Sequence, residues 1–300
     1  LNIQRAELQF TPKQVNLTDF DSKIGKTDFH MKGSIDNFVA YALRDEMLKG
    51  KFNASSVYMD INQFMTTSDE SAAPTETTSP ENEVPVDVPG NIDFELNADF
   101  KTVIYDKLEI KDLSGSIRIK DKQVGMENVK MNLLDGTISM SGFYNSQNSK
   151  VPKVDFTFNI SHFDLQKTFT AFNTIQKLAP VAKYATGKIS TSLKFKSDLD
   201  NTMSPVLNTL NGNGQLKTED VIIKGTPTLV KLGEALKQKS FEQMNVNNTD
   251  ITFEIKDGKV TVKPFDVKYK SSKINIGGDM TFDQKLNYKM TFDIPTNELG

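Results

Sequence analysis

The most regular feature of the chain is an alternation of apolar and polar residues along short segments. In residues 92–100 every even position is apolar and every odd position is polar or charged. Successive side chains of a β-strand point to opposite faces, so this segment is predicted to be a strand with one apolar face and one polar face. The same pattern recurs in residues 154–160, 251–255, 265–269 and 286–292. Such alternation is typical of antiparallel sheets that are solvated on one side.

Turn residues between the alternating segments predict that consecutive strands pair. Asp257-Gly258 is the preferred two-residue sequence of a tight β-hairpin. Asp121-Lys122 and Asp135-Gly136 separate apolar segments in the same way. Short turns join neighbouring antiparallel strands, so the predicted topology is a meander.

Internal repeats indicate that the meander is modular. Residues 119–142 correspond at one constant offset to residues 255–278, from the Ile-Lys-Asp that opens each segment to its final glycine. The apolar positions and Gly33 of the N-terminal segment repeat the pattern a third time. Repeats of this kind build arrays in which each module covers its neighbour, and we expect about five strands per module.

The pattern divides the chain into three β modules and two connectors. We expect a first, partial module at 1–65, a disordered Ser/Thr/Glu/Pro-rich linker at 66–89 and a second module at 90–165. A helical connector is expected at 166–186, and a third module at 187–300 carries an inserted helix at about 226–240. Thr226-Pro227 is the expected N-cap and first residue of that helix.

Composition excludes several classes of protein. The chain has 300 residues, a formal net charge of −3 and no cysteine, so it has neither a disulfide nor a thiolate metal site. Its bases form no stripe that would track a phosphate backbone, so nucleic acid is not an expected partner. No apolar run reaches about 18 residues, so no membrane-spanning helix is expected. The chain begins with Leu1, and we expect it to be a fragment whose targeting segment has been removed.

Catalytic chemistry has no recognisable motif in the sequence. His30 and His162 lie on the polar phase of strand-like segments without the spacing of metal ligands, and they are interpreted as surface histidines. We therefore expect no enzyme activity, no catalytic residue, no metal and no cofactor.

The apolar strand face is the remaining candidate for a functional site. Alternation alone is equally compatible with a closed sandwich or barrel core. Only two helical connectors are available to cover about fourteen predicted strands, which favours a face that is partly open. The expected lining of this face consists of Ile92, Phe94, Leu96, Phe156, Phe158, Ile160, Leu193, Phe195, Phe253, Ile255, Phe265, Val267, Ile274, Ile276, Tyr288 and Met290.

The C-terminal part of the sequence resembles a known family. Residues 210–216 read Leu-Asn-Gly-Asn-Gly-Gln-Leu and are followed by a helix, the Asp257-Gly258 hairpin and Ile-Asn-Ile-Gly-Gly-Asp-Met at 274–280. This order resembles the C-terminal region of AsmA-like proteins of double-membraned bacteria. The match covers about residues 205–295, and Gly277-Gly278 stands where the family has Gly-x-Gly.

The resemblance implies a fold and a function. The fold would be mainly β, with repeated antiparallel meander modules forming a long curved, taco-like groove. The protein would be periplasmic and anchored to the inner membrane by an N-terminal helix that this chain lacks. It would act in phospholipid traffic and outer-membrane homeostasis as a bridge-like lipid-transfer protein, with phospholipid or another acyl lipid as its partner.

Two other functions remain open on the sequence. A structural or assembly protein could bind a protein partner through its sheet edges, for example in outer-membrane protein assembly. A carbohydrate-binding wall is disfavoured, because the chain has no tryptophan to stack on a sugar and most of its phenylalanines lie on the apolar phase.

Overall fold

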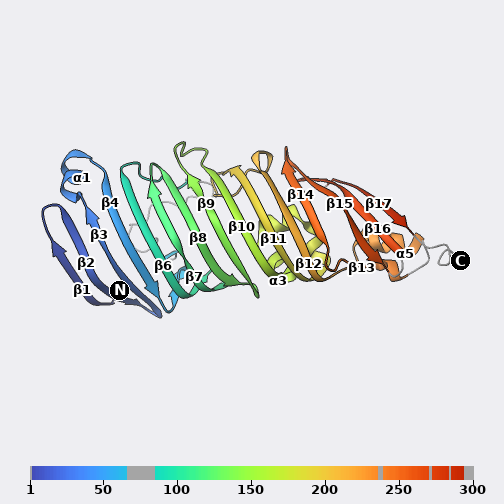
Figure 1. The fold of residues 1–300 in the computed structure, drawn as a ribbon, viewed down its shortest axis with the longest axis horizontal. Coiled ribbons are helices and arrows are strands. Elements are labelled where there is room, and N and C mark those ends of the chain that lie inside the picture. The colour runs from blue at the N-terminus through green and yellow to red at the C-terminus, as the bar shows by residue number, and fades with distance from the viewer. Residues whose placement is uncertain (1, 66–84, 236–238, 270–271, 284, 294–300) are drawn as a thin grey trace, which may run out of the picture. The chain divides into compact units, whose positions relative to one another are not determined.

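The computed structural model describes residues 2–65, 85–235, 239–269, 272–283 and 285–293 (Figure 1). These residues form 17 strands and a few short helices, so the fold is mainly β, as the alternation predicts. The chain divides into two compact units. Unit 1 comprises Leu1–Leu133, Ser139–Phe156 and Ser197–Val206, and unit 2 comprises Leu134–Ile138, Thr157–Lys196 and Leu207–Gly300.

Unit 1 is an open row of strands (Figure 1). Its elements are β1 (Asn2–Phe10), β2 (Gln14–Ile24), β3 (Thr27–Asp36), α1 (Phe38–Arg44), β4 (Leu48–Ser56), β5 (Met59–Asp60), α2 (Asn62–Met65), β6 (Ile92–Tyr105), β7 (Leu108–Lys120) and β8 (Gln123–Leu133). Consecutive strands pair antiparallel from β1 to β4 and from β6 to β8. Strands β9 (Gly136–Asn145), β10 (Lys153–Asp164) and β11 (Ala185–Asp198) are divided between the units.

One pair in unit 1 departs from the predicted antiparallel meander. β4 and β6 run parallel, with Leu48 opposite Ile92 and Ser56 opposite Phe100. Parallel neighbours need a long crossover, and residues 57–91 provide it here. The predicted linker therefore joins two strands that pair with each other.

Unit 2 is a second open meander. Its elements are α3 (Leu165–Ala171), α4 (Asn173–Leu178), η2 (Pro180–Tyr184), η3 (Leu207–Thr209), β12 (Asn211–Lys224), α5 (Pro227–Ala235), η4 (Lys239–Glu242), β13 (Gln243–Asn245), β14 (Asp250–Lys256), β15 (Lys259–Tyr269), β16 (Ser272–Thr281) and β17 (Leu286–Asp293). The strands pair antiparallel in the order β11, β12, β14, β15, β16 and β17, and β13 pairs with the end of β12.

The two predicted helical connectors are present in shortened form. The first is broken at Phe172 and Ala179 into α3, α4 and η2. Proline at position 180 cannot donate the hydrogen bond that would continue the helix, and it begins η2 instead. The second starts as predicted: the Leu229 N–H donates to Thr226 Oγ1 at 3.1 Å, and α5 begins at Pro227.

The register of the strands confirms the predicted alternation. In unit 2 Phe265 lies opposite Ile276, and Ile276 lies opposite Met290, so their side chains share one face. The neighbouring Asp266 and Lys273 are exposed on the other face, where Lys273 Nζ lies 2.8 Å from Asp266 Oδ2.

Two repeated glycines lie directly against the backbone of the next strand. A Cβ on Gly142 would lie 2.2 Å from the Asp155 carbonyl oxygen and 2.4 Å from the Phe156 ring. Its repeat partner Gly278 would place a Cβ 2.3 Å from the Asn287 carbonyl oxygen and 2.6 Å from the Cα of Tyr288. Both glycines have φ above +150°. The repeat therefore preserves a backbone contact that excludes any side chain.

Substituting Gly278 with alanine is expected to destabilise the protein by about 2–3 kcal/mol, because neither the backbone angle nor the neighbouring strand admits a Cβ. The measurement is thermal unfolding followed by circular dichroism. Gly125→Ala is the matched control, since its nearest heavy atom would lie 3.7 Å away. Equal melting temperatures for the two variants would contradict this interpretation.

The C-terminal end of the predicted disordered linker is ordered and packed. Most of that linker, residues 66–84, lies outside the described residues. Val88 is only 3% exposed, and its N–H donates to Ser146 Oγ at 2.9 Å. The Tyr144 hydroxyl donates to the Val86 carbonyl at 2.6 Å. The polar composition of the linker gave no sign of these contacts, because they involve the side chain of one valine and two backbone groups.

Asp28 fixes the end of β4 in unit 1. Its carboxylate accepts the N–H groups of Val57 at 3.0 Å and Tyr58 at 2.7 Å. Burial acts to raise the pKa of Asp28, but these backbone hydrogen bonds outweigh it and the pKa is lowered. The ionised side chain therefore stabilises the folded state above the pKa of the unfolded chain, about 3.9. This stabilisation is lost as the pH falls through the lower pKa of the folded state.

Asp28→Asn is expected to reduce stability at pH 7 by about 1–2 kcal/mol, because a neutral amide accepts these hydrogen bonds less strongly. The difference from the wild type should disappear at a pH below the folded-state pKa. Melting temperatures measured from pH 7 down to about pH 2 test this. A difference that stays constant with pH would show that the charge of Asp28 is not involved.

Candidate functional site

The apolar face of unit 1 is partly exposed to solvent. Ile92, Phe94 and Leu96 of β6 alternate onto this face, and each is half-buried rather than buried. Phe94 packs edge-to-face against Phe52 of β4, with ring centroids 5.8 Å apart. Gly50 lies beneath both rings, where an added Cβ would come within 3 Å of each. The result is a surface of aromatic and aliphatic side chains on β4 and β6 that the described residues leave partly exposed.

Cross-strand partners extend this face beyond the predicted residues. Leu96 lies opposite Ile117, Phe94 lies opposite Ile119, and both isoleucines are half-buried. β8 continues the row with Val124 and Met126. These residues were absent from the predicted lining, although Ile119, Val124 and Met126 occupy apolar positions of the internal repeat. Phe156 is the exception in unit 1, since it is buried at 9% exposure beside Gly142.

In unit 2 the predicted lining residues separate into two parts. Val267, Ile274 and Ile276 are 1%, 1% and 6% exposed, and they pack in one cluster with Leu165 of α3 and Leu229 of α5. Figure 1 shows these helices beside the strands of unit 2. The three residues therefore belong to a closed core. These three side chains contact the residues of the helices and not solvent.

In the described part of unit 2, the other lining residues cluster with residues of strands and of η3. Ile255 is buried with Leu210, Val260 and Met280, while Phe195 and Phe253 are only half-buried at its margin. Phe158, Ile160 and Leu193 are half-buried too, and Phe265 and Met290 are half-buried against the cluster that the helices close. Phe158 stacks on Phe195 with ring centroids 5.7 Å apart and planes 6° apart.

Tyr288 is the most exposed of the predicted lining residues. It lies on β17 at 38% exposure, opposite Gly278. Burial of part of its ring, together with the charge of Asp279, raises the pKa of its hydroxyl. The side chain is therefore neutral at physiological pH and adds a polar group to the margin of the face.

Charged residues occupy the opposite face. Arg118 forms two hydrogen bonds of 3.1 Å to the two carboxylate oxygens of Asp93, between β7 and β6. Burial acts to raise the pKa of Asp93, but the hydrogen bonds and charges of Arg118 and Lys120 lower it overall. Asp93, which precedes Phe94 in the sequence, is thus held by charge pairing on the opposite face of the sheet.

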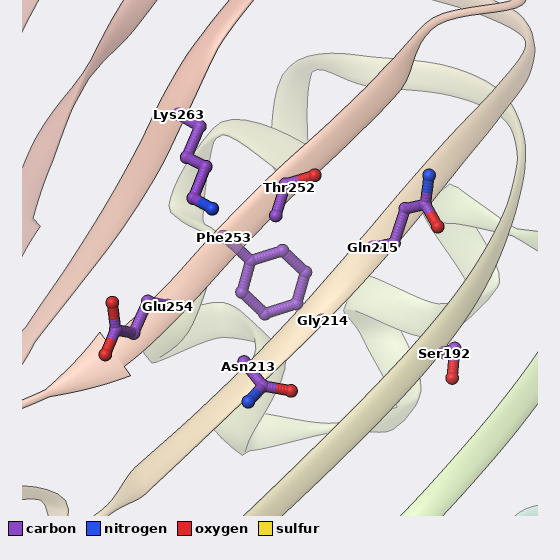
Figure 2. Close-up of a pocket in the computed structure, with 8 residues that line it drawn as sticks. All are labelled: Ser192, Asn213, Gly214, Gln215, Thr252, Phe253, Glu254 and Lys263. Atoms are coloured by element: carbon purple, nitrogen blue, oxygen red, sulfur yellow. The ribbon is translucent and has the colours of Figure 1, made fainter.

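A pocket of about 610 Å³ lies on unit 2, but it belongs to the polar phase (Figure 2). Its lining includes Ser192, Asn213, Gln215, Thr252 and Glu254, which alternate with the apolar positions of their strands. Phe253 is the one residue that this pocket shares with the predicted lining. Neutral hydrogen-bonding side chains make up half of the lining, and Glu254 and Lys263 add charge, so this pocket is more polar than the apolar face.

Neither histidine assembles a metal centre. His30 is half exposed, and its two ring nitrogens face different carboxylates, Asp21 and Asp28. His162 Nε2 lies 3.5 Å from Glu219. Among the described residues, no group of three or more His, Asp or Glu side chains is placed to hold a metal ion.

Within the same residues, no helix combines the length and apolarity needed to cross a membrane.

The chain was compared with family models, curated proteins and solved structures. None matched. The geometry of the apolar face is therefore the basis for a functional proposal.

Proposed function

We propose that the chain is a non-enzymatic lipid-binding protein whose apolar sheet face holds the acyl chains of a phospholipid or similar lipid. The observation that carries the proposal is the half-burial of Ile92, Phe94 and Leu96. In a closed core such inward-facing side chains would be buried, as Val267 and Ile274 are in unit 2. A row of partly exposed aromatic and aliphatic groups instead offers surface to an apolar ligand.

Acyl chains fit this surface by their physical chemistry. Each CH₂ group removed from water contributes about 0.8 kcal/mol, independent of direction or specific contacts. Charged pairs such as Arg118 with Asp93 lie on the opposite face of β6 and β7. A phosphate headgroup would remain in solvent at the margin, so neither a cofactor nor an energy source is required.

The resemblance to AsmA-like proteins supports the same proposal. On that basis we propose that the protein acts in the periplasm at the inner membrane. Its role there would be phospholipid transfer in outer-membrane biogenesis or homeostasis. Of the structural glycines that carry the resemblance, Gly214 lies beneath the ring of Phe253, and Gly278 lies against the backbone of Asn287 and Tyr288.

Purification without detergent followed by native mass spectrometry tests the proposal. We expect the wild-type chain to retain phospholipid, visible as mass above that of the polypeptide and identified after extraction. A chain that carries no lipid, and that takes up none from phospholipid vesicles, would overturn the proposal and favour an assembly role through sheet edges.

A further inference from the structure

The helical connector of unit 2, residues 165–184, carries positive charge only. It contains Lys167, Lys177 and Lys183 and has neither Asp nor Glu, although the whole chain has a formal net charge of −3. The sequence stays free of carboxylates as far as Ser197. The connector is therefore a local region of positive charge in a chain that is acidic overall.

The inner side of the connector packs against the sheet of unit 2. Leu165, Thr168 and Ala182 are 8%, 6% and 6% exposed, and Leu165 and Ala182 belong to the same cluster as Val267. The three elements α3, α4 and η2 also contact one another. They form one layer on the sheet, and the side chains of the connector that remain exposed lie on its outer side.

The outer side combines free lysines with apolar side chains. Lys177 and Lys183 are exposed, and neither forms an ion pair within the described part of the chain. Val181 is 48% exposed and Tyr184 is 36% exposed, although both lie next to buried alanines in the sequence. Lys183 Nζ lies 6.0 Å from the centre of the Tyr184 ring. Positive and apolar groups are thus interleaved on one exposed surface.

Two carboxylates lie beside the first turn of α3. Asp164 Oδ1 accepts the backbone N–H of Lys167 at 2.8 Å and caps the helix. Asp135 Oδ2 lies 2.5 Å from Lys167 Nζ, in a pair more than half exposed on both sides. These carboxylates compensate Lys167, whereas Lys177 and Lys183 remain available to an external anion.

We propose that the outer side of the connector docks on a membrane surface that contains anionic phospholipid. Lysines near such a surface are attracted to its negative charge, and their methylene stems can lie along apolar material while the ammonium groups reach the headgroups. Tyrosine is suited to the same interface, because its ring is apolar and its hydroxyl is polar. A nucleic-acid backbone would satisfy the lysines but leave Val181 and Tyr184 exposed, whereas a membrane interface takes up both kinds of group.

Co-sedimentation with vesicles tests the proposal directly. The chain should bind vesicles made from equal parts of phosphatidylcholine and phosphatidylglycerol at least about tenfold more tightly than vesicles of phosphatidylcholine alone. Binding should weaken as the salt concentration rises, because salt screens exposed charges. Equal binding to the two kinds of vesicle, or binding to neither, overturns the proposal.

Charge reversal locates the docking surface. The double variant Lys177→Glu with Lys183→Glu should bind the mixed vesicles about tenfold more weakly or worse. Lys194→Glu with Lys196→Glu is the matched control, because it makes the same change of charge at exposed positions on the polar face of β11. The control should bind as the wild type does, and a loss equal to that of the connector variant would contradict the proposal.

Docking does not depend on the acyl-binding face of unit 1. A charge placed on that face, as in Phe94→Asp, should leave vesicle binding unchanged even where bound phospholipid is lost. Vesicle binding that requires Phe94 but neither Lys177 nor Lys183 would assign the effect to the acyl-binding face and overturn the docking surface.

Tryptophan fluorescence gives an independent test, because the chain has no tryptophan of its own. The emission of Val181→Trp should shift to the blue on mixed vesicles as its indole enters the interface. Gln215→Trp is the control, since residue 215 is exposed on the polar face of β12 (Figure 2). An unshifted Val181→Trp, or equal shifts at both positions, overturns the proposal. If duplex DNA bound through Lys177 and Lys183 while Val181→Trp stayed unshifted on vesicles, the surface would be a nucleic-acid site instead.

Discussion

Ile274→Asp is expected to unfold unit 2, with a loss of about 4 kcal/mol or more. Ile274 is 1% exposed and lies between Val267 and Phe292 on the neighbouring strands. The helix-borne residues Leu165 and Leu229 close the same cluster. A carboxylate there has no partner and no water, and the buried isoleucine side chain is lost as well.

Chemical denaturation followed by circular dichroism measures the effect. Thr291→Asp is the matched control, because it adds the same charge to the polar face of the adjoining β17, where residue 291 is exposed. We expect it to change stability by about 0.5 kcal/mol or less. If Ile274→Asp were as stable as Thr291→Asp, the helices would not seal this part of the face.

Strand positions and register were predictable from the sequence because both follow from local rules. Alternation with a period of two predicts the face of the sheet to which each side chain points. The sequences of β6 and β15 follow this alternation. The Asp257-Gly258 turn has positive φ at both residues, as the hairpin rule requires. The repeated glycines Gly142 and Gly278 also have one physical cause, the close approach of the next strand.

Three features could not be read from the sequence because they depend on contacts between distant segments. The parallel pairing of β4 with β6 joins residues separated by the long linker. Val88 is buried although it lies in a segment of very polar composition. The pattern of alternation is also the same for Phe94, which is half-buried, and for Val267, which is sealed. Only the placement of the helices separates an open face from a core.

Phe94→Asp is expected to reduce bound phospholipid at least about tenfold while the protein remains folded. The partly exposed position lets a carboxylate keep part of its hydration, so the fold tolerates it. A bound acyl chain would have to strip that hydration, and binding is lost. The measurement is phospholipid per protein by native mass spectrometry, with melting temperature recorded alongside.

Two controls separate charge from shape at this position. Phe94→Leu removes the ring that packs against Phe52 but keeps the surface apolar, and it should retain lipid because acyl chains bind by area. Asn97→Asp adds the same charge to the opposite face of β6 and should also retain lipid. If Phe94→Asp folded normally and carried as much lipid as Asn97→Asp, lipid would bind elsewhere on the chain. If the Phe94→Asp variant unfolded, as we expect of Ile274→Asp, the face on β6 would be a closed core. The half-burial of Phe94 would then have no functional meaning.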